Sequence, residues 1–383
     1  MTSEFRAGRL GGRTPIPVSL LTGFLGSGKT TVLNHILRQP ELARTVVVIN
    51  EFGEIGLDHE LVETSSEDMV LLKSGCLCCN IRGDLIDTLR GLSARRVRGK
   101  IAPFDRVLIE TTGLADPAPI LHTLMADAAV SSDYRLDGVI TTVDAATGSP
   151  TLDHHLESVK QAAVADRLLL TKTDLVKPAD LEFLRRRLRR LNPAAPMLPV
   201  TGGEVNPRAI LDAGLFNPET KTLDVQRWLK LEAYEARDGH GHGHGPGHDH
   251  GHDHGHDHGH HHDVNRHDEN IRAFCLTVDE PIPATAFDTW LELLLAMKGP
   301  DILRVKGILN ISELDGPLVI HGVQHLFHPP LRMKAWPSDD RRSRIVFITR
   351  NVDLSALQDT LRLFTSEPPD AGTRPAGRAS SGP

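Results

Sequence analysis

Short apolar segments alternate with longer, more polar segments over the first two hundred residues of the chain. The apolar segments are rich in Val, Ile and Leu, which is typical of strands buried on both faces of a sheet. We predict strands at 16–21, 45–49, 69–72, 104–110, 137–143, 167–170 and 197–200, and helices at 31–38, 84–96, 154–165 and 180–191. This alternation indicates an α/β fold with a doubly wound, mostly parallel sheet and helices on both faces.

The pattern breaks between Gly239 and Asp263, where twelve histidines alternate with glycine and aspartate. A segment without apolar side chains cannot form a core, so we predict a disordered, histidine-rich linker at 236–268. Apolar patterning resumes with strands at 271–278, 303–311, 318–321 and 345–349 and helices at 285–298 and 354–364. The order β-α-β-β-β-α predicts a small C-terminal α+β domain.

The chain is therefore expected to form two folded domains. At 383 residues it exceeds the usual size of a single core, and 39% apolar residues are enough to build two. The predicted divisions are a flexible N-terminal extension at 1–14, a first domain at 15–235, the linker at 236–268, a second domain at 269–365 and a disordered tail at 366–383.

Charge and composition exclude several partners and locations. The net charge of −7 argues against a nucleic-acid partner, and no apolar run approaches the roughly 18 residues of a membrane span. Residues 1–15 carry three arginines but no apolar core, so we predict no secretory signal. The expected protein is soluble and cytoplasmic, with no nucleic-acid or membrane partner.

The segment Gly23–Thr30, G-F-L-G-S-G-K-T, matches the Walker A pattern G-x-x-x-x-G-K-[ST] in full. A predicted strand precedes it and a predicted helix follows, which is the context that this phosphate-binding loop requires. Backbone amides and the positive end of the helix would surround the phosphates, Lys29 would bridge the outer ones, and Thr30 would bind Mg²⁺. The predicted contacts are Gly23, Gly26, Ser27, Gly28, Lys29, Thr30 and Thr31.

A Walker B arrangement follows, with Glu where Asp is usual. The strand at 104–110 ends in Glu110, which we expect beside Thr30. There it would hold Mg²⁺ through water or orient the attacking water, so Lys29 and Glu110 are the predicted catalytic residues.

The strand at 167–170 leads into T-K-T-D, which approximates the guanine-reading motif N-K-x-D. Asp174 would accept hydrogen bonds from the N1 and N2 donors of guanine, which adenine does not offer. Lys172 belongs to the same predicted site. Thr171 stands where the motif usually has Asn, a departure that bears on base selection.

Three thiols follow another predicted strand. Cys76, Cys78 and Cys79 lie within four positions beside Gly75 and Asn80, in a loop where packing does not require cysteine. Thiolates suit zinc or another borderline-soft ion, and this spacing lets one loop bind a single ion. Cys76 and Cys79 also have the two-residue separation of a redox pair, which is the competing interpretation.

The thiols leave the fourth ligand of the metal open. Water, Glu51, Glu54 or a partner's side chain would complete the shell, and an incomplete shell is what a site that releases its metal needs. Both glutamates belong to the acidic loop 50–58 after the strand at 45–49, and such a loop has a switch role, a metal role or neither.

The remaining histidines and cysteine receive weaker assignments. At the density found in the linker, histidines bind zinc, nickel, cobalt or copper, which predicts low-selectivity metal collection. His321, His325 and His328 lie close in sequence, but their spacing predicts no defined site. Cys275 stands alone in its strand and is predicted to pack in the core.

Together these motifs resemble the CobW-type GTPases of the SIMIBI class, most closely their zinc chaperones. The resemblance covers most of the chain and rests on the Walker A segment, N-E-F-G-E-I-G-L-D at 50–58, C-L-C-C at 76–79, E-T-T-G at 110–113, T-K-T-D at 171–174, the histidine-rich linker and H-G-V-Q-H-L-F at 321–327. It implies a GTPase domain, a CxCC metal site supplied by the histidine-rich segment, and a C-terminal domain that engages a client or closes over the nucleotide.

The resulting hypothesis is a metallochaperone that binds GTP, Mg²⁺ and Zn²⁺ and couples GTP hydrolysis to transfer of zinc into a client apoprotein. Cobalt delivery in cobalamin biosynthesis is the nearest alternative. A metal-storage protein regulated by nucleotide and a P-loop kinase are two further hypotheses. A kinase would need an added acceptor for turnover, whereas a storage protein would bind many ions that hydrolysis does not release. No motif specifies an oligomeric state.

Overall fold

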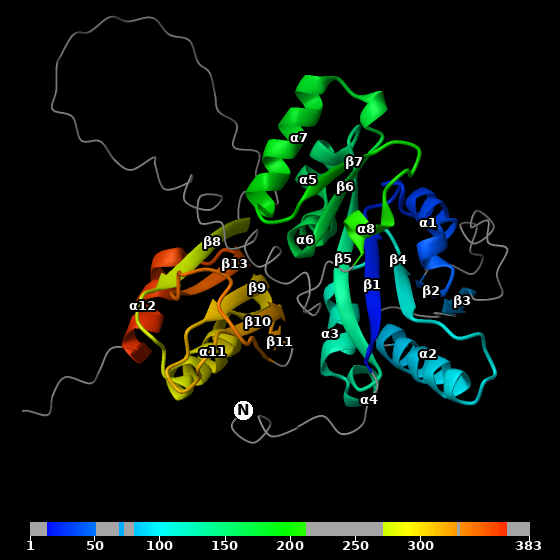
Figure 1. Cartoon of the computed structure of the whole chain (residues 1–383). Helices are drawn as coiled ribbons and strands as arrows, with labels where there is room; N and C mark the ends of the chain where they lie inside the picture. The colour runs from blue at the N-terminus through cyan, green and yellow to red at the C-terminus, as the bar shows by residue number, and fades with distance from the viewer. Residues whose placement is uncertain (1–13, 51–68, 73–79, 212–270, 328–329, 366–383) are drawn as a thin grey trace, which may run out of the picture.

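The computed structural model describes residues 14–50, 69–72, 80–211, 271–327 and 330–365. Within them the chain forms two sheets, one parallel and one antiparallel, each packed with helices (Figure 1). The predicted N-terminal extension, apart from Thr14, lies outside the described residues, as do the predicted linker and tail.

The first sheet has seven strands, and every neighbouring pair is parallel. Their order across the sheet is β3-β2-β4-β1-β5-β6-β7. The strands are β1 (Ile16–Gly23), β2 (Thr45–Asn50), β3 (Met69–Leu72), β4 (Arg106–Thr111), β5 (Tyr134–Asp144), β6 (Arg167–Thr171) and β7 (Met197–Val200). Each apolar segment predicted for this region forms a strand, which confirms the predicted fold class.

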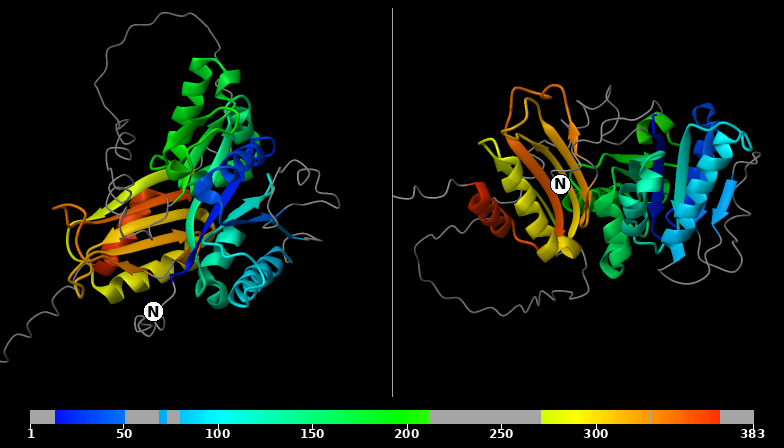
Figure 2. Two further views of the ribbon diagram at one scale, coloured as in Figure 1. Left: turned by 45° about the vertical axis from the view of Figure 1, so that its right-hand side comes forward. Right: turned by 90° about the horizontal axis from the view of Figure 1, so that it is seen from below.

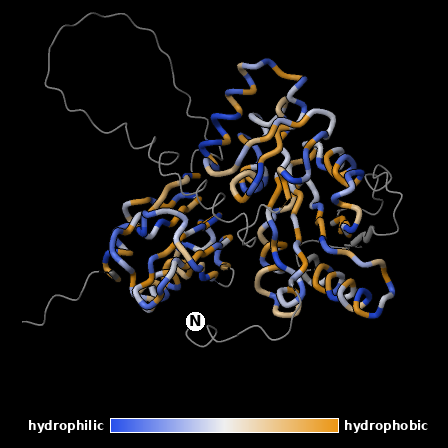
Figure 3. Tube along the Cα trace, viewed as in Figure 1, coloured by the Kyte–Doolittle hydropathy of each residue, from blue (hydrophilic) through white to orange (hydrophobic). Residues whose placement is uncertain are grey.

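Helices cover both faces of this sheet. One face carries α1 (Lys29–Leu37), η2 (Pro40–Leu42) and α8 (Pro207–Ile210), and the other carries α2 (Asn80–Val97), α3 (Ala118–Ala126), α5 (Gly148–His154), α6 (Leu156–Val164) and α7 (Pro178–Leu191). Consecutive residues Leu20 and Leu21 of β1 are both fully buried, one in each core. Figure 3 shows the hydrophobic stretches along the strands. No helix in the described segments is long and apolar enough to cross a membrane.

The single helix predicted at 154–165 is wrong, because α5 and α6 are separate helices that meet at His155. The backbone of His155 is extended, with φ −130° and ψ 107°, and its carbonyl accepts a hydrogen bond from Ser158 Oγ at 2.7 Å. The same carbonyl accepts hydrogen bonds from the backbone N–H groups of Ser158 and Val159 at 3.2 and 3.4 Å, so His155 begins α6 and does not continue α5. Helices α3, α4 (Ala128–Ser131) and α5 are additional to those that the pattern predicts.

The second sheet has six strands in antiparallel pairs, in the order β11-β10-β9-β13-β8, with β12 paired to β10. Its elements are β8 (Ile271–Val278), α11 (Ala284–Lys298), η5 (Gly299–Asp301), β9 (Ile302–Leu309), β10 (Leu318–Val323), β11 (Leu326–Phe327), β12 (Leu331–Arg332), β13 (Ser343–Arg350) and α12 (Leu354–Thr365). The predicted α+β order is confirmed. Strands β11 and β12 were not predicted, since two residues are too few to show an alternation.

Helices α11 and α12 cover one face of this second sheet, and its other face packs on the first domain (Figure 2). Ala273 and Val346 belong to the same buried cluster as Ala162 of α6 and Leu188 of α7. Cys275 packs against this cluster, which confirms its predicted packing role. The two domains therefore share a core instead of meeting only at their surfaces.

A buried group of charges lies at this domain contact. Asp166, 5% exposed, accepts hydrogen bonds from Lys306 Nζ at 2.7 Å, from the Arg304 guanidinium, and from the backbone N–H of Val139 at 2.9 Å. Burial would raise the pKa of Asp166, but the charges of Arg304 and Lys306 outweigh it and hold that pKa well below its usual value. Burial and the charge of Arg304 lower the pKa of Lys306 to about 8.

Asn192, at the end of α7, holds the end of α6 in place. Its Nδ2 lies 2.8 Å from the carbonyl oxygen of Ala165 and 3.1 Å from those of Ala162 and Ala163. These are among the carbonyls that a helix leaves without an internal partner at its end, and Asn192 is only 2% exposed.

Replacing Asn192 by Ala should lower the free energy of unfolding by about 2 kcal/mol, because buried carbonyls lose their donor. Differential scanning calorimetry of the full chain measures this as a lower unfolding temperature. Arg189→Ala on the same helix is the control, since the Arg189–Glu182 ion pair is exposed and should contribute less than about 0.5 kcal/mol. Equal effects of the two substitutions would contradict the role assigned to Asn192.

Candidate functional site

The Walker A segment joins β1 to α1 at the carboxyl edge of the parallel sheet. Three of its glycines, at positions 23, 26 and 28, have positive φ. A side chain at Gly23 would place its Cβ 2.2 Å from Thr142 Oγ1 on β5, so only glycine fits there. The segment follows β1, whose neighbours β4 and β5 lie on opposite sides. Open α/β sheets bind ligands at such a point.

The residues predicted to bind phosphate and Mg²⁺ are close together. Thr30 Oγ1 donates a hydrogen bond to Glu110 Oε1 at 3.2 Å, so Thr30 and Glu110 are neighbours, as expected. The pairing of β1 with β4, which sets Leu21 opposite Glu110, accounts for this proximity. Glu110 is 6% exposed. Lys29 Nζ donates to the carbonyl of Phe24 at 3.3 Å, across the loop.

Thr171 connects the T-K-T-D segment to the Walker A loop by a hydrogen bond and by packing. Its hydroxyl donates to the carbonyl of Ser27 at 2.8 Å, and its methyl group would lie 3.4 Å from a Cβ built on Gly28. Ser27 Oγ is in turn hydrogen-bonded to Thr142 Oγ1 at 2.7 Å. Thr171 stands where the N-K-x-D motif has Asn, and its side chain connects the end of β6 to the Walker A loop.

Asp144, at the end of β5, is a site residue that the sequence analysis missed. Its Oδ2 lies 2.6 Å from Lys172 Nζ, and its Oδ1 accepts from the backbone N–H groups of Ala146 and Thr147 at 2.8 and 3.3 Å. Lys172 has a φ of 54°, in the left-handed region that few side chains adopt. The available signal was a carboxylate that ends an apolar strand, the same signal that identified Glu110.

Asp174 lies in the turn η4 (Thr173–Leu175) after β6, and it is exposed. The Walker A loop, Asp144 and Asp174 follow three adjacent strands, β1, β5 and β6. The predicted phosphate and guanine residues therefore share one edge of the sheet. Thr31, in the first turn of α1, is also exposed there.

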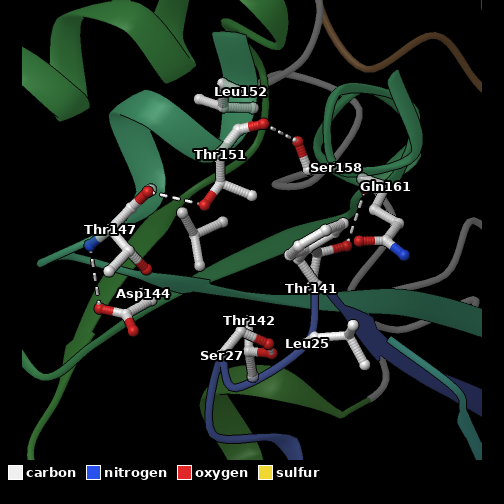
Figure 4. Close-up of a pocket in the computed structure, with 13 residues that line it drawn as sticks. Leu25, Ser27, Thr141, Thr142, Asp144, Thr147, Thr151, Leu152, Ser158 and Gln161 are labelled. Atoms are coloured by element: carbon white, nitrogen blue, oxygen red, sulfur yellow. Dashed lines mark hydrogen bonds between the residues drawn. The ribbon is translucent and has the colours of Figure 1, made fainter. Parts of the chain in front are cut away.

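A hollow behind the Walker A loop opens between the end of β5 and helices α5 and α6 (Figure 4). Hydroxyl groups line much of it, but several donate to backbone carbonyls: Thr141 to Gln161 at 2.9 Å, Thr151 to Thr147 at 2.7 Å and Ser158 to Thr151 at 3.1 Å. The first bond attaches α6 to the sheet, the second lies at the start of α5, and the third joins α6 to α5. We assign the hollow to the support of the loop, since these three hydroxyls already donate to carbonyls of the protein.

The predicted metal ligands, namely Cys76, Cys78, Cys79, Glu51 and Glu54, lie outside the described residues. The residues from which both segments leave the sheet are described. Asn50 of β2 and Leu72 of β3 are register partners, and Asn50 also pairs with Thr111, which follows Glu110. Within the described ranges, no three His, Cys, Asp or Glu side chains form a group that would hold a metal ion.

Of the three histidines left unassigned from the sequence, His321 and His325 are described. His321 is buried near the domain contact and, after Arg304 and Lys306, contributes to lowering the pKa of Asp166. The ring of His325 lies 5.9 Å from that of His122 on α3, measured between centroids. Both histidines therefore belong to the domain interface, while His328 is outside the described residues.

Known proteins resemble this chain over most of its length. Residues 17–199 match the CobW/HypB/UreG nucleotide-binding domain, and residues 271–365 match the cobalamin synthesis protein CobW C-terminal domain. The zinc chaperone YjiA of Escherichia coli is 32% identical, across 87% of this chain and 94% of YjiA. The zinc chaperone CobW of Pseudomonas aeruginosa is 32% identical across 91% of each chain. The crystal structure of Zn(II)-bound YjiA GTPase has a TM-score of 0.64 at 26% identity, covering 92% of this chain and 100% of that one.

Replacing Asp144 by Asn should weaken guanine-nucleotide binding about fivefold. The amide keeps the two backbone hydrogen bonds but loses the ion pair that orients Lys172, and a partly exposed pair of this kind contributes about 1 kcal/mol. Titration with a fluorescent guanine nucleotide measures the change. Asp105→Asn, which removes an exposed ion pair with Arg44, should leave binding unchanged. Unaltered affinity in Asp144→Asn would mean that Lys172 does not need this partner.

Proposed function

Because this chain belongs to the CobW/HypB/UreG family and is a metallochaperone GTPase, we propose that it binds zinc at its CxCC motif and transfers it to a client apoprotein under the control of GTP hydrolysis. The relatives YjiA and CobW are named zinc chaperones, which supports zinc as the cargo. Zinc is therefore the substrate of the transfer, and GTP is the substrate of the hydrolysis.

The observation that carries this proposal is the arrangement of three strand ends. Glu110 is the second-to-last residue of β4, and the last residue, Thr111, is the register partner of Asn50, which in turn pairs with Leu72. The segment with Glu51 and Glu54 thus begins at the end of β2, the neighbour of the Walker B strand, and the segment with the CxCC motif begins at the end of β3, the strand beyond it. A structural change on loss of the γ-phosphate can therefore reach either segment through these few paired residues.

We assign the phosphate-binding role to Lys29 and to the backbone of the loop from Gly23 to Thr31. Phosphate transfer to water is accelerated mainly by positioning and by charge, so the ammonium of Lys29 is the central catalytic group. The Thr30 hydroxyl and the buried Glu110 carboxylate are hard oxygen donors 3.2 Å apart, a pair that suits Mg²⁺. When bound there, Mg²⁺ would neutralise charge on the phosphate oxygens.

Guanine selection is assigned to the residues after β6. Asp174 accepts from guanine N1–H and N2–H₂, and Lys172, oriented by Asp144, contacts the nucleotide beside it. The hydroxyl of Thr171 connects this segment to the Walker A loop through the carbonyl of Ser27. Selection therefore depends on Asp174, while Thr171 sets the distance between the base and phosphate sites.

Zinc is assigned to Cys76, Cys78 and Cys79, with Glu51, Glu54, water or a client side chain as the fourth ligand. Three thiolates and one exchangeable position bind zinc tightly yet leave a route for transfer. Cobalt delivery and metal storage are the hypotheses that the second of the following experiments separates from this one.

Lys29→Ala should lower the rate of GTP hydrolysis about a hundredfold or more, because the site loses its main phosphate-neutralising charge. Release of inorganic phosphate from GTP and from ATP measures both the loss and the preference of the wild type for GTP. Lys100→Ala, an exposed lysine before β4, is the matched control and should hydrolyse GTP at the wild-type rate. Equal wild-type turnover of ATP and GTP would overturn the role of Asp174.

Zinc affinity should differ between the GTP-analogue, GDP and nucleotide-free states by about 5- to 150-fold, and zinc should change GTP affinity by the same factor. Competition with a chelating dye measures the affinity in each state, and a parallel titration with Co²⁺ tests the alternative metal. Cys78→Ser should abolish tight binding in every state, whereas Cys275→Ser, which alters a packed cysteine, should not. Identical zinc affinity in all three states would favour storage.

A further inference from the structure

Helix α6 contacts the Walker A loop at its first turn. His155, the residue before the helix, lies against Phe24 of the loop, with ring centroids 4.4 Å apart and an angle of 31° between the planes. The hydroxyl of Thr141 on β5 donates to the carbonyl of Gln161 and attaches the middle of the helix to the sheet. A helix of this length, about 14 Å, moves as one body.

Gln161 joins α6 to the loop that follows Glu110. Its side chain is only 1% exposed, and its Nε2 donates to the carbonyls of Gly113 at 3.1 Å and Ala115 at 3.0 Å. Since both partners are acceptors, the NH₂ group of the amide has to face the loop. The same two bonds therefore fix the backbone at the last residue of the E-T-T-G motif and two residues beyond it.

The loop held by Gln161 has little room to move independently. A Cβ on Gly113 would lie 2.6 Å from the backbone nitrogen of Leu25, so the loop rests directly on the Walker A segment. On its other side, Lys160 Nζ lies 2.7 Å from Asp116 Oδ2. Two consecutive residues of α6 thus hold a loop that touches the phosphate-binding loop.

The far end of α6 is attached to the second domain. The carbonyl of Val164, the last helical residue, accepts a hydrogen bond from Arg304 of β9, and Asp166 binds Arg304 and Lys306. These groups are nearly all excluded from water, so breaking one bond would leave a buried charge without its partner. We therefore expect strand β9 to move together with the end of α6.

We infer that Gln161 is a positioning residue for GTP hydrolysis, and that α6 couples the loop after Glu110 to β9 of the second domain. A change in the loop on nucleotide binding displaces α6 through Gln161, and α6 displaces β9 through Asp166. By reciprocity, a client that engages the second domain alters the geometry of the loop beside the γ-phosphate. This inference rests on the proposed function and specifies how the second domain regulates it.

Gln161→Met tests the near end of the link. Methionine fills a similar volume without donors, so the loop loses both hydrogen bonds while the core stays filled. We expect kcat for GTP to fall about tenfold and KM to change less than twofold, because misplacement of the loop affects the reaction more than nucleotide binding. Gln39→Met is the control. Gln39 follows α1 and its side-chain amide contacts His35 within that helix, so its loss should leave both kcat and KM unchanged.

Lys306→Gln tests the far end, in the other domain and without altering the loop. It should lower kcat about threefold, and the double variant with Gln161→Met should be no slower than Gln161→Met alone, because both substitutions interrupt one path. Lys334→Gln, an exposed lysine of the second domain, is the matched control. A wild-type kcat in Lys306→Gln, or fully multiplicative effects in the double variant, would overturn the coupling.

Hydrogen exchange in the full chain distinguishes the coupling from a purely structural role of Gln161, because a structural role would not make exchange in β9 depend on the bound nucleotide. The wild type should show different amide protection in residues 302–309 between the GTP-analogue and GDP states, and Gln161→Met should abolish that difference. A wild type that hydrolyses GTP and releases zinc, but shows no such difference, would refute this inference and leave the proposed function intact. Absence of GTP hydrolysis in the wild type would instead refute the proposed function.

Discussion

The pairing of β1 between β4 and β5 is the constraint on which the candidate site depends. It sets Leu21 opposite Glu110 on one side and Gly23 opposite Thr142 on the other. The phosphate loop therefore emerges between a carboxylate and a hydroxyl that come from distant parts of the chain. Because all the strands are parallel, every loop that bears a candidate residue leaves the sheet at the same edge. The geometry of the site follows from strand order before any side-chain contact is considered.

How much of this arrangement the sequence predicts depends on the distance along the chain between interacting residues. The Walker A segment, Glu110 and T-K-T-D were predictable because each is a short string at the end of an apolar strand. The partners of Lys172 and Gly113 were not, since Asp144 lies 28 positions from the first and Gln161 48 positions from the second. Neither pair produces a short motif in the sequence, because its members meet only through the order of the strands in the folded sheet.

The contact between the two domains was even less predictable from the sequence, because its residues lie farther apart along the chain. Asp166 and Arg304 are separated by 138 positions, and either residue alone reads as an ordinary surface charge in its own segment. Burying such groups costs several kcal/mol for each ion unless their geometry satisfies them. A cluster of this kind contributes little net stability, but it strongly penalises other arrangements of the two domains. Apolar packing between the domains brings them together, and the charges restrict how they meet.

The shared carboxylate has a consequence for any attempt to treat the halves of this chain as separate modules. Asp166 serves the parallel sheet through the Val139 amide and the other domain through two cations. A fragment that ends before β8 would leave this carboxylate without Arg304 or Lys306, and would expose the apolar side of α6 and α7 to solvent. A gene fusion, truncation or domain exchange among relatives therefore has to keep a carboxylate at the position of Asp166 in the first domain together with its two cations in the second.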